Sequence, residues 1–157
     1  MFNILTFTGF HTWLSLIALA SGVLLIFDLL TSRLAGRLTI LFFVTAVATN
    51  VTGFLFPFTG FLPSHGVGIF SSLVLLLALV ARYAFRLAGA WRAVYAVSLV
   101  LGVYFLAFVA IAQIFQKVPA LVALGQLPFA IAETLLLVIA VPLAVKATKS
   151  FHPAAAA

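Results

Sequence analysis

Apolar residues run through this sequence in five long blocks, separated by short stretches that contain charges, prolines or glycines. A helix that crosses a membrane needs about 20 consecutive, mostly apolar residues. All five blocks reach or nearly reach this length, so they predict a bundle of five transmembrane helices, an all-α integral membrane protein. The predicted helices cover residues 10–31, 38–56, 66–87, 93–116 and 127–146.

The fifth block is the least regular of the five, because it contains Glu133 and Pro142. An acid and a proline are both uncommon within a span, so four spans plus a re-entrant segment are the alternative. The connections between blocks are short, and neither a linker nor an internal repeat is visible. Residues 1–157 are therefore predicted to form one transmembrane domain.

Composition supports a lipid environment, since 66% of the residues are hydrophobic and only 6% are charged. Soluble domains carry roughly 25% charged residues, which this chain cannot supply. The chain has no cysteine, which excludes disulfides and thiolate metal sites.

The net charge of +6 does not point to nucleic acid, because the basic residues are spread in ones and twos between the blocks. With five spans, seven of the eight basic residues fall on one side and only Lys117 on the other. Basic residues accumulate on the cytoplasmic side, so the N-terminus is predicted outside and the C-terminus inside. The seven are Arg33, Arg37, Arg82, Arg86, Arg92, Lys146 and Lys149.

The second connection, within VTGFLFPFTGFLPSHGVGI at 51–69, is rich in phenylalanine and is broken by Pro57 and Pro63. It is predicted to be an outer turn at the membrane surface, packed over the ends of the helices. Four aromatic residues near the span ends are predicted to be interfacial anchors. These are Trp13, Trp91, Tyr83 and Tyr95.

Polar residues within the spans gather at one depth, in the half of the bilayer that is predicted to be outside. Polar groups inside a membrane are costly, so their positions indicate function or helix packing. The candidate site residues are His11, Asn50, His65, Gln113 and Glu133.

Two histidines and one carboxylate at a common depth suit three chemistries. His11 and His65 could bind a metal ion, or they could be the axial ligands of a b-type haem. Histidine and Glu133 could instead hydrogen-bond the headgroup of a quinone or quinol. The alternative is structural: histidines at the interface, Glu133 paired with Lys117, and Gln113 bonding between helices.

Signatures of the common enzyme classes are missing from the sequence. It contains no GxxxxGK[ST] phosphate loop, no GxSxG nucleophile elbow and no HExxH zinc motif. Catalysis by these mechanisms is excluded, and the sequence names no other reaction.

Two segments carry a resemblance to known proteins: the PF…LPSH turn that ends at His65, and KVPAL after Gln116. With LAGAWRAVY and PFAIAE, they resemble a group of small polytopic inner-membrane proteins of bacteria. The resemblance covers about 49–133 and implies a multi-pass protein of the bacterial inner membrane. It implies no activity.

Two functions are therefore expected. The first is a non-catalytic accessory subunit that associates in the lipid bilayer with other membrane subunits or with itself, because the chain has almost no extramembrane mass. The second is a small redox or quinone-site protein that uses the outer polar residues. Nucleic acid is not an expected partner.

Overall fold

The computed structural model describes residues 3–33, 36–57, 60 and 63–152. Regular structure in these residues is helical, and five helices are long and apolar enough to cross a membrane, which confirms the predicted number. Their bounds lie close to the predicted ones. The helices are α1 (Phe7–Leu30), α2 (Gly36–Phe54), α3 (Pro63–Leu79) continued by the π-helix η1 (Val80–Ala84), α4 (Trp91–Lys117) and α6 (Gln126–Ser150). The short α5 (Pro119–Val122) joins α4 to α6.

The fifth predicted span is a single helix, since α6 runs for 25 residues with Pro142 inside it. Its length favours five spans over four spans and a re-entrant segment. Part of the predicted 51–69 turn, residues 58–59 and 61–62, lies outside the described residues.

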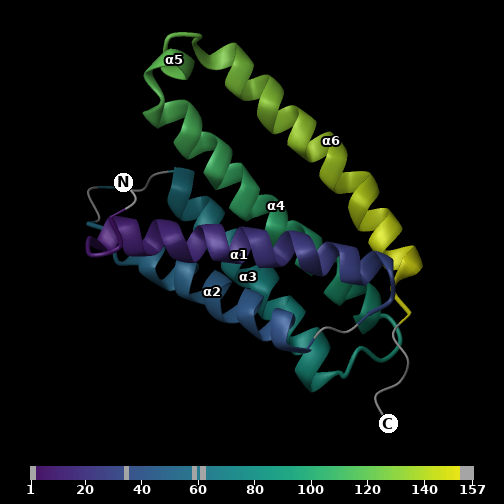
Figure 1. Cartoon of the computed structure of the whole chain (residues 1–157). Coiled ribbons are helices and arrows are strands. Elements are labelled where there is room, and N and C mark those ends of the chain that lie inside the picture. Colours follow the sequence, from purple (N-terminus) through teal and green to yellow (C-terminus); the bar gives the residue numbers. More distant parts are fainter. Residues whose placement is uncertain (1–2, 34–35, 58–59, 61–62, 153–157) are drawn as a thin grey trace.

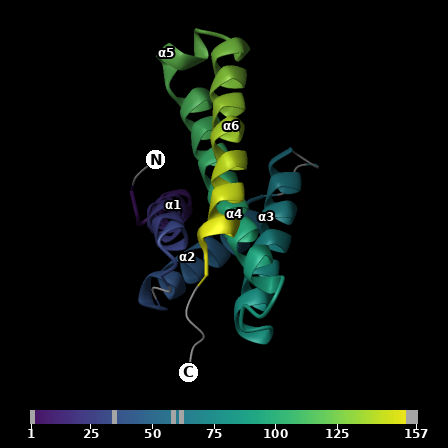
Figure 2. The ribbon, with the colours of Figure 1, turned by 90° about the vertical axis from the view of Figure 1, so that its right-hand side faces the viewer.

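Helix α4 is the centre of the arrangement, because it contacts α1, α3 and α6 (Figure 1). Helices α1 and α2 form an antiparallel pair on one side of α4, and α3 lies on another side (Figure 2). Helix α6 packs along α4 and reaches α1 only weakly. The α4–α5–α6 hairpin therefore leans away from the α1–α2 pair at its α5 tip (Figure 1).

The two ends of the bundle differ in chemistry. We call the end where α1, α3 and α6 begin the histidine end, because His11 and His65 lie within the first two turns of α1 and α3. We call the opposite end the arginine end. It contains the seven basic residues named above, in the 31–35 and 85–90 connections or in the adjoining turns of the helices.

Small residues allow the central helices to approach closely. Gly22 of α1 is buried, and a Cβ atom added there would lie 2.5 Å from Val103 Cγ2 of α4. The same atom would lie 2.8 Å from Cε2 of Phe42, whose ring is fully buried on α2. Three helices thus meet at one glycine, which is how small residues are used in membrane bundles.

Tyr95 is the centre of the core at the arginine end. Its side chain is 1% exposed, so the prediction that it is an interfacial anchor was wrong. Its ring packs 5.7 Å from the ring of Phe151, which is also fully buried. Its hydroxyl accepts a 3.4 Å hydrogen bond from Arg82 Nη1. Packing between helices therefore outweighs the preference of tyrosine for the membrane surface.

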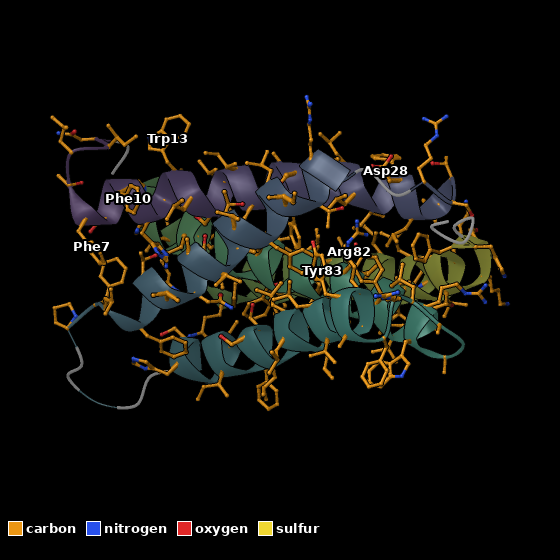
Figure 3. The ribbon with its side chains drawn as sticks, turned by 90° about the horizontal axis from the view of Figure 1, so that it is seen from below. Phe7, Phe10, Trp13, Asp28, Arg82 and Tyr83 are labelled. Atoms are coloured by element: carbon orange, nitrogen blue, oxygen red, sulfur yellow. The ribbon has the colours of Figure 1, made fainter. Side chains whose placement is uncertain are left out.

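The end of α6 is joined to the connection between α1 and α2. Ser32 Oγ donates a hydrogen bond to the Ser150 carbonyl, and the His152 amide donates to Ser32 Oγ at 3.0 Å. These bonds hold Phe151 over the core. In Figure 3, Arg82 lies among the helices, whereas Asp28 lies on the outer side of α1.

The outside of the bundle is apolar on all five long helices. Large side chains such as Phe27, Val44, Leu76 and Ile139 are each more than half exposed. A soluble protein rarely exposes so large an apolar surface, whereas lipid covers it without cost. The fold is therefore compatible with a multi-pass membrane protein.

Candidate functional site

A cavity of about 490 Å³ lies at the histidine end, between α1, α2, α3 and α4. Four of the five predicted site residues line it, one from each helix: His11, Asn50, His65 and Gln113. Lys117, at the end of α4, also lines it. The predicted clustering of these polar residues at one depth thus corresponds to a single, partly open cavity.

The rest of the cavity wall is mainly apolar. Leu16 and Leu19 line it from α1, Phe54 from α2, and Phe105 and Leu106 from α4. Six Ser and Thr side chains also line it: Thr8, Thr12, Ser15, Thr49, Ser64 and Ser71. A largely apolar cavity of several hundred cubic ångströms with polar groups in its wall is typical of sites for small, largely apolar ligands.

The ring of His11 is held in place by α2 and by Phe56, which follows the end of α2. Nδ1 lies 2.8 Å from Thr52 Oγ1. The ring meets Phe56 edge to face, with centroids 5.2 Å apart and an interplanar angle of 90°. A Cβ atom added to Gly53 would lie 3.6 Å from His11 Cε1, so this glycine lets α2 lie close beside the imidazole. His11 is therefore a positioned side chain with one ring nitrogen engaged.

Phe56 also contacts an aromatic residue at the start of α1. The ring centroid of Phe7 lies 4.9 Å from that of Phe56. Phe7 and Phe10 lie at the beginning of α1 in Figure 3, and Trp13 points away from the other helices. The aromatic rings thus cover the histidine end beside His11.

Asn50 binds α2 to α3. Its Nδ2 donates hydrogen bonds to Ser71 Oγ at 3.2 Å and to Ser72 Oγ at 3.1 Å. Ser72 Oγ in turn donates to the Gly68 carbonyl at 2.8 Å. Asn50 is therefore used mainly for packing between helices, although it lines the cavity.

Glu133 lies apart from the other four predicted residues. It is on α6, which contributes none of the described residues that line the cavity. Both carboxylate oxygens are buried and have no hydrogen-bond partner in the described part of the chain.

The predicted metal site has two residues that could take part. His11 and His65 line the same cavity from α1 and α3. Among the described residues, no group of three or more His, Cys, Asp or Glu side chains could hold a metal ion. Two imidazoles suit axial ligation of haem or hydrogen bonding to a ligand better than a metal site built from protein ligands alone.

Thr52 and Phe56 contact His11 and were not among the site residues predicted from the sequence. A signal for Thr52 existed: α1 and α2 are antiparallel and joined by a short connection. Residues about equally far from such a connection lie at the same depth, which places Thr52 beside His11.

Comparison with known proteins does not add to this description: no family model, no curated protein and no solved structure matches the chain.

Proposed function

We propose that this protein binds a small, lipid-soluble ligand of the quinone class in the cavity at the histidine end. The observation that supports this proposal best is that His11, His65 and Gln113 line one apolar cavity together with Asn50. A quinone has a ring with two polar oxygens and an apolar tail, which matches a few polar groups on an apolar wall.

The charges at the cavity agree with a neutral headgroup. The described residues that line it include one cation, Lys117, and no acid. Imidazole and amide groups can hydrogen-bond the oxygens of a neutral ring, and the Lys117 ammonium at the end of α4 can remain in contact with water. The apolar walls from α1, α2 and α4 would surround the ring and the first part of its tail.

The membrane and the orientation are part of the same proposal. The protein belongs to the bacterial inner membrane, as the resemblance of its PF…LPSH and KVPAL segments suggests. The arginine end faces the cytoplasm because it carries seven of the eight basic residues. The ligand site then lies in the outer half of the bilayer and is reached from the lipid.

Filling the cavity tests the proposal. In nanodiscs, isothermal titration calorimetry with decylubiquinone should detect saturable binding to the unaltered protein. Ala110→Phe places a ring in the cavity and should weaken binding at least tenfold. The control Leu76→Phe adds a ring at a position 56% exposed on α3 and should bind normally. Equal binding by both variants, or no binding to the unaltered protein, would refute a quinone site.

A haem in the same cavity would give a different result. The reduced-minus-oxidised visible spectrum of the purified protein should show no b-type haem band if the ligand is a quinone. A band that disappears in both His11→Ala and His65→Ala would replace the quinone proposal with an electron-transfer haem held by those residues.

An accessory subunit of a larger membrane complex is the second candidate function. The exposed surface of α6 favours it, because large apolar side chains such as Leu127, Val138 and Ile139 are each more than half exposed. A neighbouring membrane subunit or a second copy could pack there as well as lipid. Purification in mild detergent followed by native mass spectrometry tests this, and a protein found only as a monomer without partners would rule it out.

A further inference from the structure

The orientation of His11 restricts which form of the ligand the cavity can accept. The key is the Thr52 hydroxyl, which lies 2.7 Å from the Ala48 carbonyl and 3.1 Å from the Thr49 carbonyl. A hydroxyl group has one hydrogen, and this hydrogen is directed toward the backbone of α2. The oxygen of Thr52 can then only accept a hydrogen bond from His11.

His11 Nδ1 must therefore be the donor in the 2.8 Å contact with Thr52 Oγ1. A neutral imidazole carries one N–H, so the other nitrogen, Nε2, has an unshared electron pair. Within the described part of the chain, no hydrogen bond to Nε2 is found, and His11 is one of the cavity-lining residues. The cavity thus contains an aromatic nitrogen that can accept a hydrogen bond but cannot give one.

We propose that the cavity selects the hydroquinone form of its ligand over the quinone form, through a hydrogen bond from a ligand hydroxyl to His11 Nε2. This inference rests on the proposed function. A quinone carbonyl has no hydrogen to offer, and its oxygen would face the electron pair of Nε2. Nε2 would then be covered by the ligand and left unpaired, which weakens binding.

Thr52 is a positioning residue in this arrangement, because it holds His11 in the tautomer that makes Nε2 an acceptor. Gln113, which lines the cavity from α4, carries both donors and an acceptor and can bind either ligand form. The proposed discrimination is assigned to His11, with Thr52 holding its ring. Leaving one acceptor unpaired corresponds to a preference on the order of tenfold.

Three ligands of similar shape distinguish the effect of a hydroxyl donor on the ligand from the effect of how well the ligand fits the cavity. Under anaerobic conditions, calorimetry in nanodiscs would compare decylubiquinone, its hydroquinone, and the dimethyl ether of that hydroquinone. The hydroquinone should bind on the order of tenfold more tightly than either ligand without a hydroxyl group. Equal affinities for all three would overturn the inference while leaving the proposed quinone site intact. No binding by any of them would overturn both.

Other hydroxyl-bearing apolar molecules present the same chemistry, so an isoprenoid alcohol belongs in the comparison. Farnesol has the hydroxyl group and an apolar tail but no ring to fill the space beside His11. It should bind more weakly than the hydroquinone. Tighter binding by farnesol would overturn the assignment to hydroquinone.

Variants of Thr52 test the positioning role. Thr52→Val keeps the side-chain shape but removes the oxygen that accepts from Nδ1, so the preference for hydroquinone should fall toward equal affinities. Thr52→Ser retains the oxygen and should keep the preference. Thr45→Val is the matched control, because the Thr45 hydroxyl bonds to carbonyls of its own helix and does not contact His11. An unchanged preference in Thr52→Val would overturn this role.

The tautomer itself can be observed without a ligand. Nitrogen-15 NMR of histidine-labelled protein distinguishes a protonated Nδ1 from a protonated Nε2, and His11→Asn identifies the His11 signals. The expected result is the Nδ1–H form in the unaltered protein and its loss in Thr52→Val. The Nε2–H form in the unaltered protein would overturn the inference.

Discussion

Gly22 gives the sharpest test of how closely α1, α2 and α4 approach one another. The methyl group of Gly22→Ala would lie 2.5 Å from Val103 Cγ2 and 2.8 Å from Phe42 Cε2, closer than such atoms can stay. Val103 is β-branched and therefore stiff, and the Phe42 ring is fully buried, so neither can move away easily. Overpacking of this kind costs about 1–3 kcal/mol.

Two other glycines serve as controls for the packing cost of Gly22→Ala. A Cβ atom at Gly66 of α3 would meet no atom of the described residues within 4 Å, and one at Gly102 of α4 would lie 3.4 Å from Leu75 Cδ2, an ordinary contact. All three positions are helical, so the gain in helix propensity from glycine to alanine, roughly 1 kcal/mol, is common to them. The difference between Gly22→Ala and Gly66→Ala therefore isolates the packing cost, about 1–3 kcal/mol.

The assay is unfolding by sodium dodecyl sulfate from mixed micelles, followed by far-UV circular dichroism. The expected order of unfolding free energy places Gly22→Ala lowest, with Gly102→Ala and Gly66→Ala close to the unaltered protein or above it. A difference of less than about 0.5 kcal/mol between Gly22→Ala and Gly66→Ala would refute the close three-helix contact.

The same unfolding assay checks three further predictions. Phe151→Ala removes a fully buried ring and should lower the unfolding free energy by about 3–5 kcal/mol; a loss below about 1 kcal/mol would mean that the ring does not complete the core. Asn50→Leu removes the hydrogen bonds to Ser71 and Ser72 of α3. It should lower the unfolding free energy by about 1–2 kcal/mol, since such bonds average about 0.6 kcal/mol each in membranes. An unchanged unfolding free energy would contradict this role of Asn50. Glu133→Gln should leave stability unchanged or raise it, because the carboxylate has no partner among the described residues; a clear loss would reveal one.

The five helices could be predicted from the sequence because burial in lipid requires long apolar blocks, and nothing else in the chain competes with that signal. Depth was also predictable, since short connections fix how far each residue lies from the ends of its helix. His11, Asn50, His65 and Gln113 were expected at one depth, and they line one cavity.

Rotation of each helix about its axis could not be predicted in the same way. Hydropathy is nearly uniform around these helices, so the faces that meet are chosen by side-chain fit. Glu133 has the expected place along its helix, but α6 packs on α4 and not on the cavity. Tyr95 was expected at the membrane surface but instead packs against Phe151. Phe151 lies 56 residues further along the chain, so no local sequence pattern could reveal this contact.

The attachment of Phe151 has a consequence for how the chain is made. A protein is synthesised from its N-terminus onward, so α1–α4 are complete while the Tyr95 ring is still uncovered. The ring that covers it arrives only after α6 has been synthesised, together with the bonds between Ser32 and residues 150 and 152. Nascent chains stalled before residue 151 should therefore remain sensitive to membrane proteases, and the bundle should become resistant only after residue 151 has left the ribosome.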